Sequence, residues 1–131
     1  MFAWIGGRTA VVSTPATQAH IHFGRPAITG GIVLWLCANT PPITPPTTIP
    51  LPQPCPPFPA TITGTLTAAD VVAVSGQGID AGAAGFAQMV AALRTGSAYA
   101  NVHTTLRPGG EIRGRIGPAP IGTASTNTAN D

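Results

Sequence analysis

The alternation of residue types between Ser97 and Ile116 constrains the fold of this chain more than any other feature. A Pro-Gly-Gly sequence at 108–110 interrupts two runs in which every second residue is polar. Side chains of a β-strand point to alternate faces of the sheet. The stretch therefore predicts a β-hairpin with one polar face, whose members are Tyr99, Asn101, His103, Glu111, Arg113 and Arg115.

Other segments also have strand patterns. Gln18–Phe23 alternates, with His20 and His22 on one face, and Ile32–Cys37 is a continuous apolar run of the kind that is buried on both faces. Ala60–Leu66 is rich in β-branched residues, which favour strands. Residues 1–12 suggest a hairpin or one broken strand around Gly6-Gly7. We therefore expect about five to seven strands.

Helical signals are few and short. Thr67 and Asp70 have the spacing of a capping box, which predicts a helical turn at residues 68–72. Apolar residues recur at helical spacing from Phe86 to Leu93, and the helix should end near Arg94 with Gly96 as its C-cap. Antiparallel hairpin signals dominate, so the sequence predicts an all-β fold, a β-sandwich or partly open barrel with one or two short helices.

The segment from Asn39 to Pro59 holds ten of the fifteen prolines. Proline lacks an N–H donor and fixes φ, so this density predicts an extended loop without helix or ladder. Cys37 and Cys55 bracket the loop, and we expect a disulfide in preference to half of a metal site. The PxxP spacing of Pro42 and Pro45 leaves a docking ligand open as an alternative to an ordinary insertion.

Composition excludes several classes of partner. Charged residues make up 8%, against about 25% in typical soluble domains, and the net charge is +2 with no basic run. We therefore expect no nucleic-acid partner and, because the longest apolar run is only residues 31–38, no membrane span. Low charge favours association, although GC-rich codon usage gives a similar composition. The start of the chain has no basic leader, so we expect a mature or truncated chain or another export route.

Four motifs stand out along the chain: Ala19-His20-Ile21-His22, Thr63-Gly64-Thr65-Leu66, Tyr99-Ala100-Asn101-Val102-His103-Thr104 and Pro108-Gly109-Gly110-Glu111-Ile112-Arg113-Gly114. Together they resemble the CHRD domain, which is named after chordin and is widespread in secreted bacterial proteins. The similarity covers roughly Gln18 to Ile116. Cys37, Cys55-Pro56 and the LTAADVV segment followed by Gly78-Ile79 resemble the bacterial branch.

The resemblance implies an antiparallel immunoglobulin-like or superoxide-dismutase-like β-sandwich, extracellular or at the cell surface. We expect one domain over residues 1–117 and a flexible tail at 118–131. Chordin sequesters growth factors, so the implied role is a non-enzymatic binding or structural module with an extracellular protein partner. CHRD domains usually have more strands before the AHIH motif than this chain provides. An incomplete sheet edge predicts self-assembly by strand complementation into an oligomer, fibre or matrix.

The histidines suggest an alternative function. His20 and His22 share a strand face, and His103 would join them if the strands containing these motifs are neighbours. Three imidazoles suit copper or zinc, which could be redox-active, and Asn101 or Glu111 could orient a ring. The competing interpretation is that the imidazoles only bond to neighbouring groups and make the sheet rigid.

Catalytic patterns are absent from the sequence. No Gly-x-Ser-x-Gly turn accompanies His103, and Gly76-Gln77-Gly78 is not followed by the Gly-Lys-Ser/Thr of a phosphate loop. Arg113 or Arg115 should form an ion pair with a carboxylate on a neighbouring strand, because Glu111 is too close in sequence to face Arg113. We therefore expect no enzyme and no catalytic residue.

Overall fold

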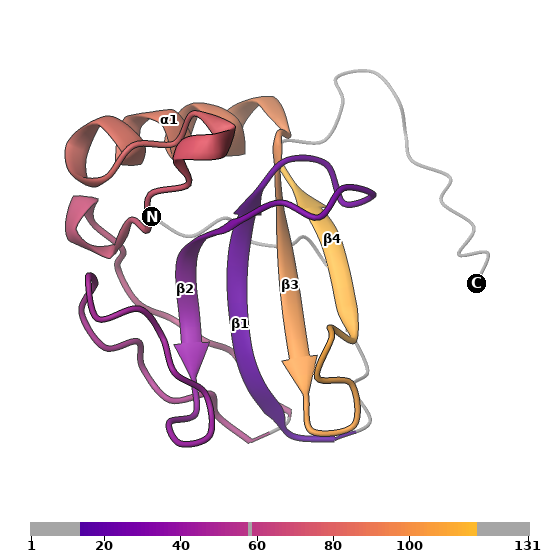
Figure 1. Ribbon diagram of the computed structural model, residues 1–131. Coiled ribbons are helices and arrows are strands. Elements are labelled where there is room, and N and C mark those ends of the chain that lie inside the picture. The colour runs from indigo at the N-terminus through magenta and orange to yellow at the C-terminus, as the bar shows by residue number, and fades with distance from the viewer. Residues whose placement is uncertain (1–13, 58, 118–131) are drawn as a thin grey trace.

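The computed structural model describes residues 14–57 and 59–117, which contain one antiparallel sheet (Figure 1). Its order is β2-β1-β3-β4, and all neighbouring strands are antiparallel. The expected antiparallel, mostly β class is confirmed and is consistent with a sandwich-like fold. The strands are β1 (Ala16–Phe23), β2 (Ile32–Ala38), β3 (Ala98–Thr104) and β4 (Ile112–Ile116).

Helix α1 (Gly82–Thr95) lies across one end of the sheet (Figure 1). It begins before the expected Phe86 and ends as predicted, with Gly96 in the left-handed region at a φ of 72° and its N–H donating to Ala92 O. Two 3₁₀ turns precede it, η1 (Ala68–Asp70) and η2 (Ser75–Gln77). The capping box is confirmed, because Thr67 and Asp70 exchange side-chain and main-chain bonds around η1.

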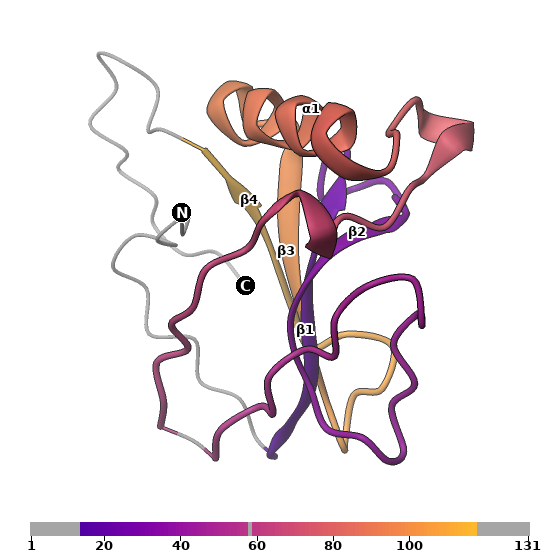
Figure 2. The ribbon, with the colours of Figure 1, turned by 90° about the vertical axis from the view of Figure 1, so that its left-hand side faces the viewer.

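The two faces of the sheet differ, as strand alternation requires. One face packs against α1, and together they form the main apolar core. The opposite face carries polar side chains; those on β1 and β3 are mostly buried as well, whereas Arg113 and Arg115 on β4 are exposed. Figure 2 shows the sheet nearly edge-on, with the connecting segments on either side of it. The buried core residues include Ile21, Leu34, Met89, Ala92, Ala98, Ala100 and Ile116, and the buried polar residues are His20, His22, Asn101, His103 and Thr104.

The proline-rich segment is a loop, as expected, and it is tied to the sheet. Cys37 and Cys55 form a disulfide with a Cα–Cα distance of 4.9 Å, and both residues are buried in a second apolar cluster with Ala16 and Ala19. The Ala38 N–H donates to Gln53 O (2.9 Å), so the loop also bonds to the outer edge of β2.

Ala60–Leu66 was wrongly expected to be a strand. It has no ladder pairing, and a side-chain hydrogen bond from Gln53 Nε2 to Thr63 O (3.1 Å) joins it to the proline-rich segment. Prolines at alternate positions of 50–56 remove the N–H groups that a ladder needs. The described ranges therefore hold four strands, one fewer than the five that the patterns within those ranges predicted. The N-terminal pattern at 1–12 and the tail at 118–131 lie outside the described residues.

Candidate functional site

The three histidines meet on the polar face of β1 and β3. Register places His20 opposite Asn101 and His22 opposite Tyr99, while His103 lies one polar position further along β3. The ring centroid of His20 is 4.7 Å from that of His22 and 4.6 Å from that of His103. The convergence that the sequence suggested is therefore present. We call His20, His22 and His103 the histidine cluster.

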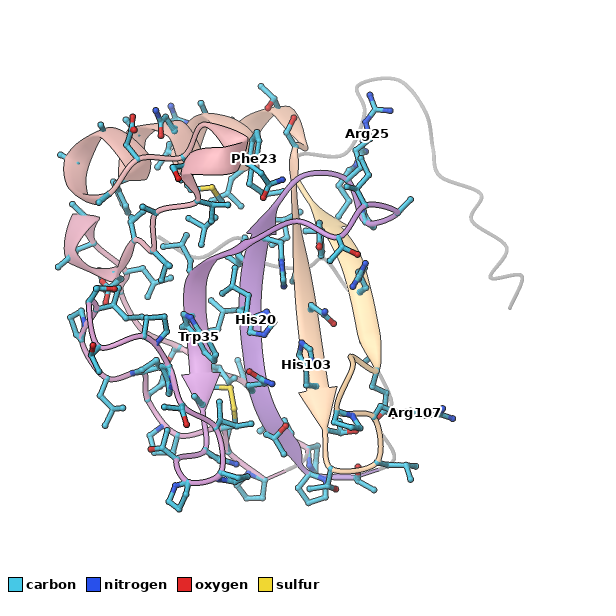
Figure 3. All side chains as sticks on the ribbon, viewed as in Figure 1. His20, Phe23, Arg25, Trp35, His103 and Arg107 are labelled. Carbon is cyan, nitrogen blue, oxygen red and sulfur yellow. A yellow bond between two sulfur atoms is a disulfide. The ribbon has the colours of Figure 1, made fainter. Side chains whose placement is uncertain are left out.

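The histidine cluster is buried. The exposed fractions are 1% for His20, 7% for His22 and 9% for His103. Trp35 of β2 lies opposite His20 and packs edge-on against its ring at 5.1 Å. Figure 3 shows His20 between Trp35 and His103. These polar rings must therefore find partners inside the protein, because an unpartnered buried polar group is costly.

A chain of hydrogen bonds orients two of the rings. His22 Nδ1 lies 2.7 Å from Gly30 O, and His22 Nε2 lies 2.8 Å from His20 Nδ1. A carbonyl oxygen only accepts, so His22 Nδ1 is the donor. Neutral His22 then accepts at Nε2, and His20 Nδ1 carries the proton of the second bond. His103 makes a similar bond, with Nδ1 donating to Pro108 O (2.7 Å).

Burial keeps the first two rings neutral. Burial lowers the pKa of His20 to about 3, helped by the positive charge that His22 and His103 can carry. The pKa of His22 is also lowered, chiefly by burial and against the opposing bond to Gly30 O. In neutral His20 with its proton on Nδ1, the Nε2 atom presents a lone pair.

Tyr99 and Arg113 extend the cluster towards β4. The Tyr99 ring stacks on His22 with centroids 4.7 Å apart and planes 3° from parallel. The Arg113 guanidinium lies 5.0 Å above the Tyr99 ring, and Nη1 donates to Pro26 O (3.0 Å). In the described part of the chain, Arg113 therefore meets an aromatic ring and a carbonyl rather than the carboxylate that we expected.

Asn101 and Glu111 occupy different surroundings. Asn101 is 2% exposed and lies against Gly110, with a side-chain oxygen that accepts no hydrogen bond. Glu111 accepts a bond from the hydroxyl of Thr104. Asn101 therefore lies within the buried polar face, next to His20 in register, whereas Glu111 fixes the start of the second hairpin arm.

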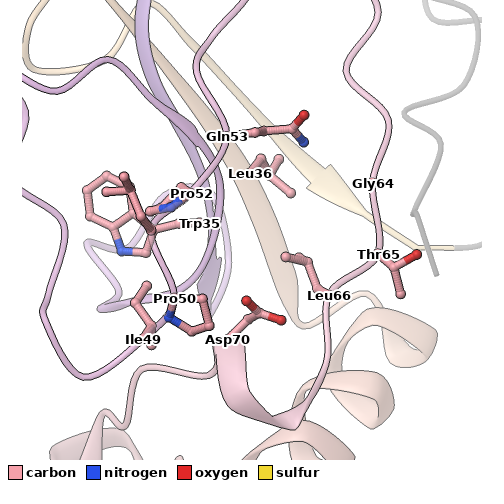
Figure 4. Close-up of a pocket in the computed structure, with 11 residues that line it drawn as sticks. Trp35, Leu36, Ile49, Pro50, Pro52, Gln53, Gly64, Thr65, Leu66 and Asp70 are labelled. Atoms are coloured by element: carbon pink, nitrogen blue, oxygen red, sulfur yellow. The ribbon is translucent and has the colours of Figure 1, made fainter.

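A separate pocket of about 250 Å³ lies between the proline-rich loop and residues 64–66 (Figure 4). Its walls are mainly apolar, and the Asp70 carboxylate at its margin is already bonded to Thr67. Trp35 lines this pocket and also contacts His20. The pocket lining includes Leu36, Ile49, Pro50, Leu51, Pro52, Gln53 and Leu66.

Both ring nitrogens of His22 are engaged in hydrogen bonds, one with Gly30 and one with His20. Across residues 14–57 and 59–117, no group of three or more His, Cys, Asp or Glu side chains is placed to hold a metal ion. None of the helices in the same ranges is long and apolar enough to cross a membrane.

The fold and the site define a small, mostly β antiparallel domain with a disulfide-tied loop and a buried polar cluster. The CHRD domain family model matches residues 7–116 of the 131-residue chain. The chain belongs to the CHRD domain family, which is a family of non-enzymatic and typically extracellular modules, and the disulfide fits that setting. Neither a curated protein nor a solved structure matches the chain significantly.

Sequence reasoning missed two members of the site. Gly30 contributes both main-chain groups, because its carbonyl accepts from His22 and its N–H donates to the Tyr99 hydroxyl (3.0 Å). Trp35 supplies one wall. The even spacing of Tyr99 and His103 indicated that they share a face of the sheet. No pattern of neighbouring residues indicates that the carbonyl of Gly30, which lies in a loop, bonds to His22.

Proposed function

We propose that this chain is a non-enzymatic extracellular binding and structural module that associates through the outer edge of β4. A second copy of the chain is the partner that we assign to this edge, giving an oligomer or filament by β-strand addition. The observation that carries the proposal is the position of β4 at the end of the sheet. Within the described residues β4 pairs only with β3.

The two edges of the sheet differ in how they are covered. At the β2 edge, Val72 N–H donates to Val33 O (2.9 Å) and Ala38 N–H donates to Gln53 O (2.9 Å). No corresponding main-chain bond reaches the outer side of β4 from residues 14–57 or 59–117. A strand edge with unpaired N–H and C=O groups is a template for another strand.

Charge on β4 restricts the register of such pairing. Arg113 and Arg115 are exposed and flank Gly114. Like charges directly opposite each other destabilise a strand pair. A second copy therefore pairs in a register that keeps these arginines apart. The low net charge of +2 leaves little further repulsion between copies.

The absence of catalysis in this proposal rests on how the histidines are used. His20 and His22 bond to each other, and His22 and His103 bond to the main-chain carbonyls of Gly30 and Pro108. None of these bonds activates a serine, threonine or cysteine, as nucleophilic catalysis requires.

Light scattering over a concentration series, combined with amide hydrogen exchange by NMR, tests the proposal. We expect association at high concentration, with alternate amides of β4 gaining protection while the amides of β2 are unchanged. β2 serves as the internal control because its edge is already bonded. A strictly monomeric protein at high concentration, or association that protects other strands instead, would contradict the proposal.

A second candidate function is binding of copper or zinc at the histidine cluster. It is favoured by His20 Nε2 and His103 Nε2, two buried ring nitrogens without a hydrogen-bond partner. Elemental analysis and metal titration of the purified chain test it. Stoichiometric copper or zinc supports this function, and a chain that binds neither metal refutes it.

A further inference from the structure

The polar face contains three buried acceptors that lack donors. His20 Nε2, His103 Nε2 and Asn101 Oδ1 have no hydrogen-bond partner, although each atom is inaccessible to solvent. His20 faces Asn101 across the β1–β3 ladder, and His103 follows Asn101 on the same face of β3. Trp35 Nε1, a donor on the ring that packs against His20, also has no partner. Buried polar atoms in folded proteins are nearly always satisfied, so the three acceptors call for a donor, such as a buried water molecule or the Trp35 N–H, or for a cation.

The hydrogen bonds at the other ring nitrogens fix which atoms are available. His20 Nδ1 donates to His22, and His103 Nδ1 donates to Pro108 O. In their neutral forms both rings therefore present an unprotonated Nε2. A histidine that binds a metal typically donates its other N–H in this way, to a carbonyl or another acceptor.

We infer that His20 and His103 bind one copper ion through their Nε2 atoms, with the Asn101 side-chain oxygen as a third donor and His22 as a positioning residue. This inference rests on the second candidate function above and narrows it to one donor set and one metal. It replaces the three-imidazole set, because His22 uses both of its nitrogens in hydrogen bonds.

The spacing of the rings fits this assignment. Metal–nitrogen bonds are about 2.0 Å long, so two imidazoles on one ion at a right angle hold their centroids about 4.5 Å apart. The centroids of His20 and His103 are 4.6 Å apart. Right angles between nitrogen and oxygen donors are the tetragonal geometry that Cu²⁺ prefers.

The type of the third donor favours copper over zinc. Zinc ligands in proteins are normally His, Cys or a carboxylate, whereas the third donor of this group is a neutral amide oxygen. For the same nitrogen donors, Cu²⁺ also binds more tightly than Zn²⁺.

Matched asparagine variants separate ligands from the positioning residue. An asparagine amide reaches the place of Nδ1 and can keep that bond, but it has no atom at the place of Nε2. The chelator-treated full chain and the three variants His20→Asn, His22→Asn and His103→Asn are titrated with Cu²⁺ alone and with Zn²⁺ alone. Near-UV circular dichroism of each variant reports whether the core is intact.

We expect one Cu²⁺ per wild-type chain, nitrogen hyperfine structure from two imidazoles in the electron paramagnetic resonance spectrum, and weaker binding of Zn²⁺. His20→Asn and His103→Asn should abolish copper binding, while His22→Asn should lower the affinity only about tenfold, as for other residues that orient ligands. The spectrum of the wild type tests the donor count even if a variant fails to fold.

Three outcomes would overturn the inference in distinguishable ways. Equal loss of copper in all three variants, or a spectrum with three nitrogens, would restore the three-histidine set and leave the metal-binding function standing. Preference for Zn²⁺ would refute the choice of copper alone. A chain that binds neither ion would refute both the inference and the metal-binding function.

Discussion

Replacing Gly30 by alanine should damage the buried polar face directly. A Cβ at this position would lie 2.1 Å from the carbonyl oxygen of Phe23, so the main chain of the loop has to shift. That shift moves the carbonyl that accepts from His22 (2.7 Å) and the N–H that donates to Tyr99 (3.0 Å). A net hydrogen bond contributes about 1 kcal/mol, and a buried group left unpaired costs about 1–3 kcal/mol. We therefore expect Gly30→Ala to lower the free energy of unfolding by about 2–4 kcal/mol.

The measurement is urea unfolding followed by tryptophan fluorescence, with Gly76→Ala as the matched control. A Cβ at Gly76 meets nothing within 4 Å, so the same chemical change there should be neutral or stabilise the protein by up to about 1 kcal/mol. The variants are compared through the midpoint and slope of two-state curves. The reasoning is refuted if Gly30→Ala unfolds within about 0.5 kcal/mol of Gly76→Ala, which is the usual range for a neutral surface change.

Three further predictions concern the disulfide, a buried hydroxyl and a helix cap. Replacing both Cys37 and Cys55 by alanine opens a loop that the disulfide closes across 18 residues. The chain-entropy relation predicts that the free energy of unfolding falls by about 3 kcal/mol. Urea unfolding measures this change, and an unchanged midpoint would contradict the prediction. Tyr99→Phe leaves the Gly30 N–H without its acceptor, so the free energy of unfolding should fall by about 1–3 kcal/mol. The Gly30 amide should also exchange its hydrogen faster, as measured by NMR, and an amide that stays protected would argue against the bond. Thr67→Ala removes the capping box of η1 and should cost about 1 kcal/mol in thermal unfolding, whereas an unchanged melting temperature would show that the cap is not needed.

Features that depend on residues close in sequence were predictable. The hairpin from Ser97, the strand around His20, the capping box at Thr67 and the glycine that ends α1 all appear where their patterns placed them. Each follows from side-chain alternation, helical spacing or the freedom of glycine at positive φ, which are properties of a few consecutive residues.

The pairing of Ala60–Leu66 could not be predicted from its own composition. Its β-branched residues favour a strand, but a strand also needs a neighbour with free N–H groups. The adjacent loop is rich in proline and supplies few of them. The β-propensity of the segment therefore predicted a strand that does not form, because no neighbouring strand is available to pair with it.

The sequence by itself determined that this chain makes an antiparallel hairpin with one polar face, a short capped turn and one helix, because these depend on local periodicity. Only the tertiary structure decided that β1 lies between β2 and β3, and so that His20 meets His103. It also decided that the carbonyl of Gly30 reaches His22 and that the three histidines of the polar face are buried. Those contacts join segments far apart in the chain, and their geometry is set by the packing of the whole sheet.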